Sequence, residues 1–156
     1  MQFAIERVSV SELLASVGVF VAPLATAKGL ELDVDRPPAD LQVLADREKA
    51  MQVLVNLAGN AVKFTERGMV SISIHECDDA VEIIVRDTGQ GIPPERLQGI
   101  FDPFVQVDAR PGRLAEGIGL GLAISRDLAR GMGGEIGVRS EVGAGSEFAV
   151  RLPRAP

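Results

Sequence analysis

The stretch Asp46–Gly68, DREKAMQVLVNLAGNAVKFTERG, is predicted to form a helix with two unlike faces, and a chain that contains it must fold so as to bury one of them. Asp46 is suited to cap the helix start, and Gly68 is suited to supply the left-handed residue after its end. At about 100° per residue, the apolar side chains that share one face and suit a core are Met51, Leu54, Ala58 and Ala61.

The opposite face of this helix carries two amides and one ammonium group. Asn56, Asn60 and Lys63 are spaced i, i+4 and i+7, so they share an arc of roughly 60°. Because Mg²⁺ prefers oxygen ligands and phosphate prefers a point positive charge, this face suits a magnesium polyphosphate. A helix whose polar side simply faces water explains the same pattern, and the helix alone favours that plainer interpretation.

The segments around this helix show strand and helix patterns that are mixed without strict βαβ alternation. A Ser9–Glu12 capping box opens another helix, which is expected to run to about Lys28 and to end at Gly29. Its apolar stripe comprises Leu13, Leu14, Val17, Val21 and Leu24. Further predicted elements are strands at 3–8, 30–35 and 41–44, hairpins at 69–77 with 80–86 and 135–140 with 146–152, a helical turn near 93–98, and a helix at 119–130. The pattern favours an α+β protein with one sheet and helices on one face, and residues 153–156 are expected to fray.

Size and charge narrow the functions that this chain can have. The 156 residues fit a single domain over 1–156, and the net charge of −6 argues against a nucleic-acid-binding surface. The lone Cys77 cannot form an intrachain disulfide, and no spacing of Cys and His is typical of a zinc site. The most apolar run, at 17–27, is short and contains Pro23, so neither a membrane span nor membrane contact is expected. The start shows no signal-peptide pattern, so a cytoplasmic location is expected.

Two glycine-rich segments bound a long irregular region at 87–118. In the first, Gly89 and Gly91 follow Asp87, which places a carboxylate acceptor beside backbone that a ligand such as adenine, with its exocyclic amine, can approach closely. A tight turn with a solvated aspartate explains this hexapeptide equally well. The second segment, GIGLGLA at 117–123, opens a helix and offers unpaired N–H groups to an anion, although a hinge or a tight packing contact also explains it. A dinucleotide fingerprint needs a preceding strand, which is missing there, and the chain contains no P-loop.

Five motifs, in one order along the chain, resemble those of the histidine-kinase ATP-binding domain, and the likeness covers nearly all of residues 3–153. They are the N box NLAGNAVKFT at 56–65, the first glycine box DTGQGI at 87–92, the F box FDPFVQ at 101–106, the second glycine box GLGLAIS at 119–125, and the closing strand motif GAGSEF at 143–148. The resemblance implies the Bergerat fold, a two-layer α/β sandwich with a mixed, mostly antiparallel sheet, helices on one face and a long ATP lid at about 105–118.

The resemblance also implies a set of site residues. Asp87 would bind the adenine amino group, with Ser146 helping through water, and Asn60, with Asn56 nearby, would coordinate Mg²⁺. The full implied ATP-binding set is Asn56, Asn60, Lys63, Phe64, Asp87, Gly89, Gly91, Ile92, Gly117, Gly119, Leu120, Gly121, Leu122 and Ser146. Phe101, Phe104 and Arg113 would support the lid, and either Arg110 or Arg113 would reach the γ-phosphate.

By the same resemblance, the chain would bind Mg-ATP and donate the γ-phosphoryl group to a histidine on a separate dimerisation hairpin, either in the same full-length protein or in trans. A response regulator would act downstream. Hydrolysing members of the superfamily carry a glutamate where this chain has Asn56, and an amide cannot take up a proton near neutral pH, so slow hydrolysis is expected. The only histidine, His75, lies on a predicted strand and no phosphoacceptor hairpin is found, so this chain alone is not expected to autophosphorylate.

Two other functions stay open from the sequence. One is a serine kinase and binding switch of the anti-sigma type, which shares the fold. The other is a scaffolding domain whose nucleotide site has degenerated. The F box and the long lid favour the sensor kinases over the first alternative, and the intact glycine boxes argue against the second. Ala115 and Glu116 stand where many relatives carry Gly-Gly or Gly-Thr. The resemblance therefore does not predict how the lid closes.

Overall fold

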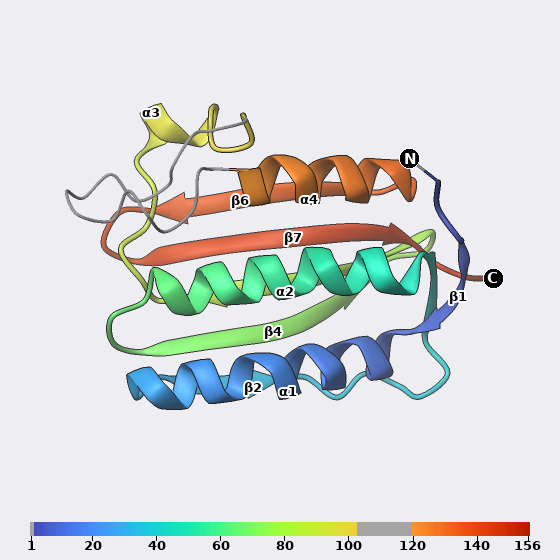
Figure 1. Ribbon diagram of the computed structural model, residues 1–156, viewed down its shortest axis with the longest axis horizontal. Helices are drawn as coiled ribbons and strands as arrows, with labels where there is room; N and C mark the ends of the chain where they lie inside the picture. The colour runs from blue at the N-terminus through green and yellow to red at the C-terminus, as the bar shows by residue number, and fades with distance from the viewer. Residues whose placement is uncertain (1, 103–119) are drawn as a thin grey trace.

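The part of the protein that the structure describes folds into two layers, a five-stranded sheet and three helices that cover one of its faces (Figure 1). The computed structural model describes residues 2–102 and 120–156, with the backbone alone described for Leu120. The order of strands is β2 (Glu31–Val34), β4 (Met69–Glu76), β5 (Ala80–Asp87), β7 (Gly145–Pro153) and β6 (Glu135–Glu141). β2 is parallel to β4, and the other neighbours are antiparallel. The prediction of an α+β sandwich with a mixed, mostly antiparallel sheet is therefore confirmed.

The helices are α1 (Val10–Lys28), α2 (Arg47–Lys63) and α4 (Leu120–Gly131), and a short helix, α3 (Pro94–Leu97), follows β5. α2 lies between α1 and α4 in the helical layer (Figure 1). The core forms where the apolar side of α2, including Leu54 and Leu57, meets alternate strand residues such as Ile72 and Ile83. Period-2 strands and an amphipathic helix each have only one apolar side, so stacking them is the way to remove both sides from water.

A second, small sheet pairs β1 (Glu6–Ser9) with β3 (Gln42–Ala45), which the sequence did not predict as a separate sheet. Within it β1 begins at Glu6 rather than at Phe3, because the register with β3 starts where Glu6 lies opposite Ala45. The prediction that residues 153–156 fray is wrong. Arg154 forms a bridge to Val43, and the N–H of Ala155 donates to the Gln42 carbonyl over 2.9 Å.

Helix α1 begins and ends as predicted. The Ser9 side chain accepts a hydrogen bond from the Glu12 N–H over 3.2 Å, and Gly29 takes a left-handed conformation with φ of 71°. One member of its predicted core stripe is wrong, because Leu24 lies at the edge of the buried arc and 42% of it is exposed. With 19 residues and a mean hydropathy of 1.7, α1 is also long and apolar enough to cross a membrane by length and composition alone, a test that a buried core helix passes as well.

Helix α2 begins at the predicted cap but ends earlier than predicted. Asp46 accepts from the Lys49 N–H over 3.2 Å and also from the N–H of Ala4 over 2.9 Å. The helix ends at Lys63, where Lys28 and Thr65 bind carbonyl groups of its last turn. Those partners satisfy the terminal carbonyls, so Gly68 is not needed as a cap. Gly68, with φ of 119°, instead lies in the turn that leads into β4.

Candidate functional site

A pocket opens between the C-terminal half of α2, the end of β5 and the start of α4. It encloses about 350 Å³ of space between its lining atoms, part of which is open to solvent. Its lining residues are Asn60, Ala61, Phe64, Asp87, Gln90, Gly91, Ile92, Leu122, Ser146 and Phe148. Seven of these are members of the set that the sequence resemblance singled out: Asn60, Phe64, Asp87, Gly91, Ile92, Leu122 and Ser146. Segments far apart in the chain thus meet at one place in the fold.

Asp87 is the charged residue of the pocket wall and is 6% exposed. It is the last residue of β5, where it lies between Val70 of β4 and Ser146 of β7. Its Oδ1 atom accepts from the N–H of Gly89 over 2.9 Å and from the N–H of Ser146 over 3.3 Å. Burial raises the pKa of the Asp87 carboxyl above its ordinary value of 3.8, although those two N–H groups oppose the rise.

Both hydrogen bonds within the described residues fall on one oxygen of Asp87, which leaves Oδ2 as an acceptor for a ligand. No fully buried side-chain oxygen among the described residues lacks a partner, so Oδ2 stays within reach of the pocket opening, and a ligand N–H group that approaches it would gain a hydrogen bond to a charged acceptor. Ala61, Ile92, Leu122 and Phe148 add apolar surface around the carboxylate. The combination suits a flat aromatic heterocycle with an exocyclic amine.

Two serines connect the pocket wall to the second hairpin. The Ser146 and Ser140 hydroxyl oxygens lie 2.8 Å apart, and Ser140 also donates to the Gly145 carbonyl and accepts from the Ile92 N–H. Ser140 was not among the residues predicted from the sequence. Its only signal there is its place in the hairpin, since it lies directly opposite Ser146 in the register of β6 and β7. It therefore holds both Ser146 and the backbone at Ile92 in position.

Glycines allow the loops around Asp87 to pack against backbone. A Cβ atom on Gly89 would lie 2.4 Å from the Phe64 carbonyl oxygen, and one on Gly91, where φ is 77°, would lie 2.2 Å from that of Glu141. Gly145, with φ of 124°, would place its Cβ 2.0 Å from the Asp87 carbonyl oxygen. Glycine is required at these positions because any side chain would displace main-chain atoms of a neighbouring segment.

The two asparagines of α2 have different surroundings. Asn60 lines the pocket, whereas Asn56 lies one turn earlier and faces α4. The Asn56 Nδ2 atom donates to the hydroxyl of the buried Ser125 over 3.0 Å, and a Cβ on Gly121 would lie 2.6 Å from the Asn56 Oδ1 atom. Ser125 is thus a supporting residue that the predicted site set lacked. Close approach of Gly121 explains why the first turn of α4 can lie beside the asparagine face of α2.

Lys63 and Phe64 lie at the end of α2 next to the pocket. The Lys63 Nζ atom is 5.4 Å from the centroid of the Phe64 ring, close enough for a cation–π contact. The backbone N–H of Phe64 donates to the Asn60 carbonyl over 2.9 Å, so the helix end holds both residues next to Asn60. The ammonium group of Lys63 and the amide of Asn60 therefore lie at the same end of α2, an arrangement that suits a metal-bound polyphosphate.

Phe101, predicted to support the lid, packs against the pocket from outside. Its ring meets that of Phe148 edge to face, with centroids 6.4 Å apart, and the guanidinium of Arg126 lies 5.0 Å from its centroid. The remaining predicted residues lie outside the described part of the chain. They are Phe104, Arg110, Arg113, Gly117, Gly119 and the proposed lid at 105–118, together with the side chain of Leu120.

Comparison with known proteins gives one consistent result. The family described as histidine kinase-, DNA gyrase B-, and HSP90-like ATPase matches over residues 45–156. Histidine protein kinase DivJ of Caulobacter vibrioides is 44% identical over 126 residues, which cover 80% of this chain and 21% of DivJ. Aerobic respiration control sensor protein ArcB of Escherichia coli is 39% identical over 150 residues, which cover 94% of this chain and 19% of ArcB. The chain thus spans about a fifth of the length of these curated relatives.

Solved structures agree with the sequence relatives. The crystal structure of full-length ShkA in complex with AMPPNP superposes with a TM-score of 0.84 and 38% sequence identity, covering 99% of this chain and 32% of that one. The catalytic domain of histidine kinase ThkA, in a nucleotide-free form, superposes with a TM-score of 0.83 and 29% identity, covering 99% of this chain and 97% of that domain. The match to ThkA therefore extends over nearly the whole of an isolated catalytic domain.

Proposed function

Because this chain belongs to the histidine kinase-, DNA gyrase B-, and HSP90-like ATPase family, as a kinase catalytic domain of the sensor histidine kinase type, we propose that it binds Mg-ATP and donates the γ-phosphoryl group to a histidine on a separate domain. The acceptor would be a dimerisation and phosphoacceptor hairpin, and a response regulator would receive the phosphoryl group next. The observation that carries the proposal is the buried Asp87 carboxylate, which offers one oxygen atom to a largely apolar pocket beside Asn60.

The adenine base would occupy this pocket. Its exocyclic amine would donate to the Asp87 Oδ2 atom, and Ser146 would assist through a water molecule. Apolar contact with Ile92, Leu122 and Phe148 would exclude water from the edges of the base and strengthen the single polar contact. One well-oriented carboxylate in such a site selects an amine over a carbonyl, so adenine is favoured over guanine at this position.

The triphosphate would extend from the pocket along the asparagine face of α2. Asn60, supported by Asn56, offers an amide oxygen to Mg²⁺, and Lys63 offers its ammonium group to phosphate. Phe64 would flank the nucleotide. Bound Mg²⁺ would neutralise charge that develops on the phosphate oxygens during transfer. Gly121 and Leu122 lie in the first turn of α4, whose first N–H groups suit phosphate, and Gly117 and Gly119 are proposed to extend that anion site.

Phosphoryl transfer is favoured over hydrolysis because position 56, one turn before the proposed magnesium ligand Asn60, carries an amide rather than a carboxylate base. Asn56 is an amide, and its Nδ2 donates to Ser125, so it is turned toward α4 and cannot accept a proton from water. We expect an intrinsic ATPase rate far below that of the hydrolysing members of the family. A rate equal to theirs that disappears in Asp87→Asn would contradict this interpretation.

Titration calorimetry with ADP in magnesium buffer tests nucleotide binding. Asp87→Asn should weaken ADP binding by about 10- to 100-fold, because a hydrogen bond to a charged group is worth roughly 1.5–3 kcal/mol. Asp33→Asn is a matched control, since Asp33 is an exposed carboxylate on β2, away from the pocket. Equal ADP affinity in the wild-type protein and the Asp87 variant would refute the assignment of Asp87.

A second experiment tests the acceptor. The chain is incubated with labelled ATP, with and without a histidine-containing dimerisation hairpin. We expect an acid-labile label on the hairpin and no label on this chain, because His75 lies on β4 at the end of the hairpin remote from Asp87. Acid-stable label on a serine would support the anti-sigma alternative instead. We further propose that the domain works in the cytoplasm, where ATP and response regulators are available.

A further inference from the structure

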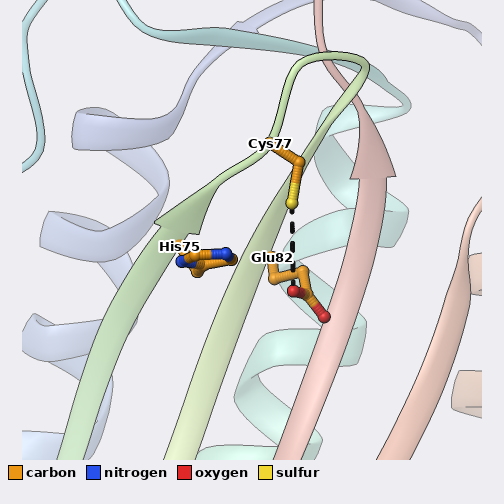
Figure 2. A group of neighbouring side chains, drawn as sticks. All are labelled: His75, Cys77 and Glu82. Atoms are coloured by element: carbon orange, nitrogen blue, oxygen red, sulfur yellow. Dashed lines mark hydrogen bonds between the residues drawn. The ribbon is translucent and has the colours of Figure 1, made fainter.

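His75, Cys77 and Glu82 bring three different metal-ligating groups together at the turn between β4 and β5 (Figure 2). His75 and Glu82 lie directly opposite each other in the antiparallel register, and Cys77 follows His75 by two positions just beyond the end of β4. Alternate residues of a strand point to one side, so the imidazole, thiol and carboxylate share the face of the sheet opposite Ile72, which is buried in the core. These are the only histidine and the only cysteine of the whole chain.

The three ligand atoms are close to the spacing that a metal ion needs. One atom from each residue lies within 4.8 Å of the others, and the Cys77 Sγ and Glu82 Oε1 atoms are 4.0 Å apart. In a tetrahedral zinc site, with metal–ligand distances of roughly 2.0–2.3 Å, ligand atoms lie about 3.3–3.8 Å apart. A contraction of about 1 Å would therefore complete the site. That is within the reach of side-chain rotation, because His75 is exposed and the other two residues are only half-buried.

The charges around the cluster allow a divalent ion. The Arg151 Nη1 atom lies 3.7 Å from the Cys77 sulfur, while Nη2 of the same side chain pairs with Asp79 at 3.0 Å. Arg154, the other nearby arginine, pairs with Glu76 at 3.1 Å. Since both arginines have acidic partners, the thiolate and the Glu82 carboxylate together supply the two negative charges that a divalent cation would balance.

We propose that His75, Cys77 and Glu82 form a binding site for a divalent transition metal ion of the Zn²⁺ class, with water as the fourth ligand. Thiolate and imidazole select borderline metals such as zinc over Mg²⁺ or Ca²⁺, which prefer oxygen. No zinc pattern was recognised in the sequence because a His-x-Cys pair has too few ligands, and the third ligand comes from the neighbouring strand. Glu82 is five residues from Asp87 along β5, roughly 17 Å at about 3.3 Å per residue, so this site is separate from the nucleotide pocket.

Titration of the reduced protein with Co²⁺, in the absence of nucleotide and Mg²⁺, tests the proposal. Co²⁺ bound to a thiolate gives a near-ultraviolet charge-transfer band, and with one cysteine in the chain that band can come only from Cys77. We expect one Co²⁺ per chain, displacement of the band by Zn²⁺, and a higher Tm of the wild-type protein with Zn²⁺ than without it. A metal that binds only the folded state must stabilise it.

Variants separate this site from binding elsewhere on the chain. Cys77→Ser should abolish the charge-transfer band. His75→Gln and Glu82→Gln should each weaken Co²⁺ binding by more than about tenfold, since losing even a group that only hydrogen-bonds to a metal ligand lowers metal affinity by about that factor. Asp78→Asn, which removes an exposed charge from the same turn, should leave the affinity unchanged. Absence of the band, unchanged affinity in His75→Gln, or one metal ion per two chains would overturn the proposal. None of these outcomes bears on nucleotide binding, which is measured separately.

Discussion

Asp87 is buried without a cationic partner in the part of the chain that the structure describes, which is an unusual state for a carboxylate. Two backbone N–H groups, from Gly89 and Ser146, compensate for only part of the lost hydration. A ligand donor that reaches its other oxygen would add a third hydrogen bond and offset more of this desolvation. At the scale of the residue, the site is therefore costly to the empty domain and selective for a ligand with an amine.

The pH dependence of Asp87 follows from its burial. The pKa of Asp87 is raised in the folded protein above its ordinary value of 3.8, so the folded state binds a proton at higher pH than the unfolded chain does. As the pH falls from the raised pKa toward the ordinary one, this group adds stability to the folded state, and nucleotide binding weakens because a protonated carboxyl accepts poorly. A carboxyl-carbon NMR titration, assigned with Asp87→Asn, should give a midpoint above 3.8. A midpoint at or below that value would contradict the prediction.

At the scale of the element, α2 joins a core face to a polar face, and two glycines near that polar face have different surroundings. Gly59 lies in the interior of α2 with nothing within 4 Å of the position of a Cβ atom in the described structure. Gly121 lies in the first turn of α4, where a Cβ would lie 2.6 Å from the Asn56 Oδ1 atom. The first glycine costs helix stability without a packing reason, whereas the second allows two helices to approach.

Alanine at these two glycines should have opposite effects. Gly59→Ala should raise the free energy of unfolding by about 0.5–1 kcal/mol through helix propensity. Gly121→Ala should lower it by about 1 kcal/mol, because Asn56 must move and its hydrogen bond to Ser125 is lost. Denaturant unfolding measures both changes.

The cost of Gly121→Ala should disappear in the Asn56→Ala background, since the new methyl group then meets no amide. A cost that stays the same in that background would show that Asn56 is not the group displaced. Gly59→Ala is the matched control, because it makes the same chemical change in a helix of the same layer without a close neighbour.

Local signals in the sequence were sufficient for most elements and failed where distant segments decide. The Ser9 and Asp46 caps and the two hairpins depend on nearby residues, and they form as predicted. The end of α2 was placed too late because Lys28, which is remote in sequence, binds its last carbonyls. The pocket residues came from motifs of a known family. Ser125 lies at the end of one of these motifs but was not predicted as a site residue, and Ser140 lies in none, although both hold site residues by hydrogen bonds.

At the scale of the whole molecule, two sheets and one helical layer are joined by the residues that follow β7. The strand β7 extends toward the small sheet of β1 and β3, at the end of the fold opposite α3 (Figure 1). There the N–H of Arg154 donates to the Asp79 carbonyl, the N–H of Ala155 donates to the Gln42 carbonyl, and Arg7 donates to the Pro156 carbonyl. Residues 154–156 therefore connect the β4–β5 turn, β3 and β1 to one another.

Removing residues 154–156 should lower the free energy of unfolding by about 2 kcal/mol, since several hydrogen bonds of roughly 0.5–1.5 kcal/mol each are lost. For a domain of this size, that corresponds to a fall in Tm of roughly 4–8 °C. Arg154→Ala is the matched control: it removes the contacts with Glu76 and the Cys77 carbonyl but keeps the backbone bonds, so it should cost less than half as much.

Hydrogen exchange should locate the effect, because amides of β1 and β3 lose the segment that ties them to the main sheet while those of β5 keep both neighbouring strands. Truncated protein with an unchanged Tm, or with exchange accelerated equally in β5 and β3, would mean that the small sheet is held by its contacts with the core alone.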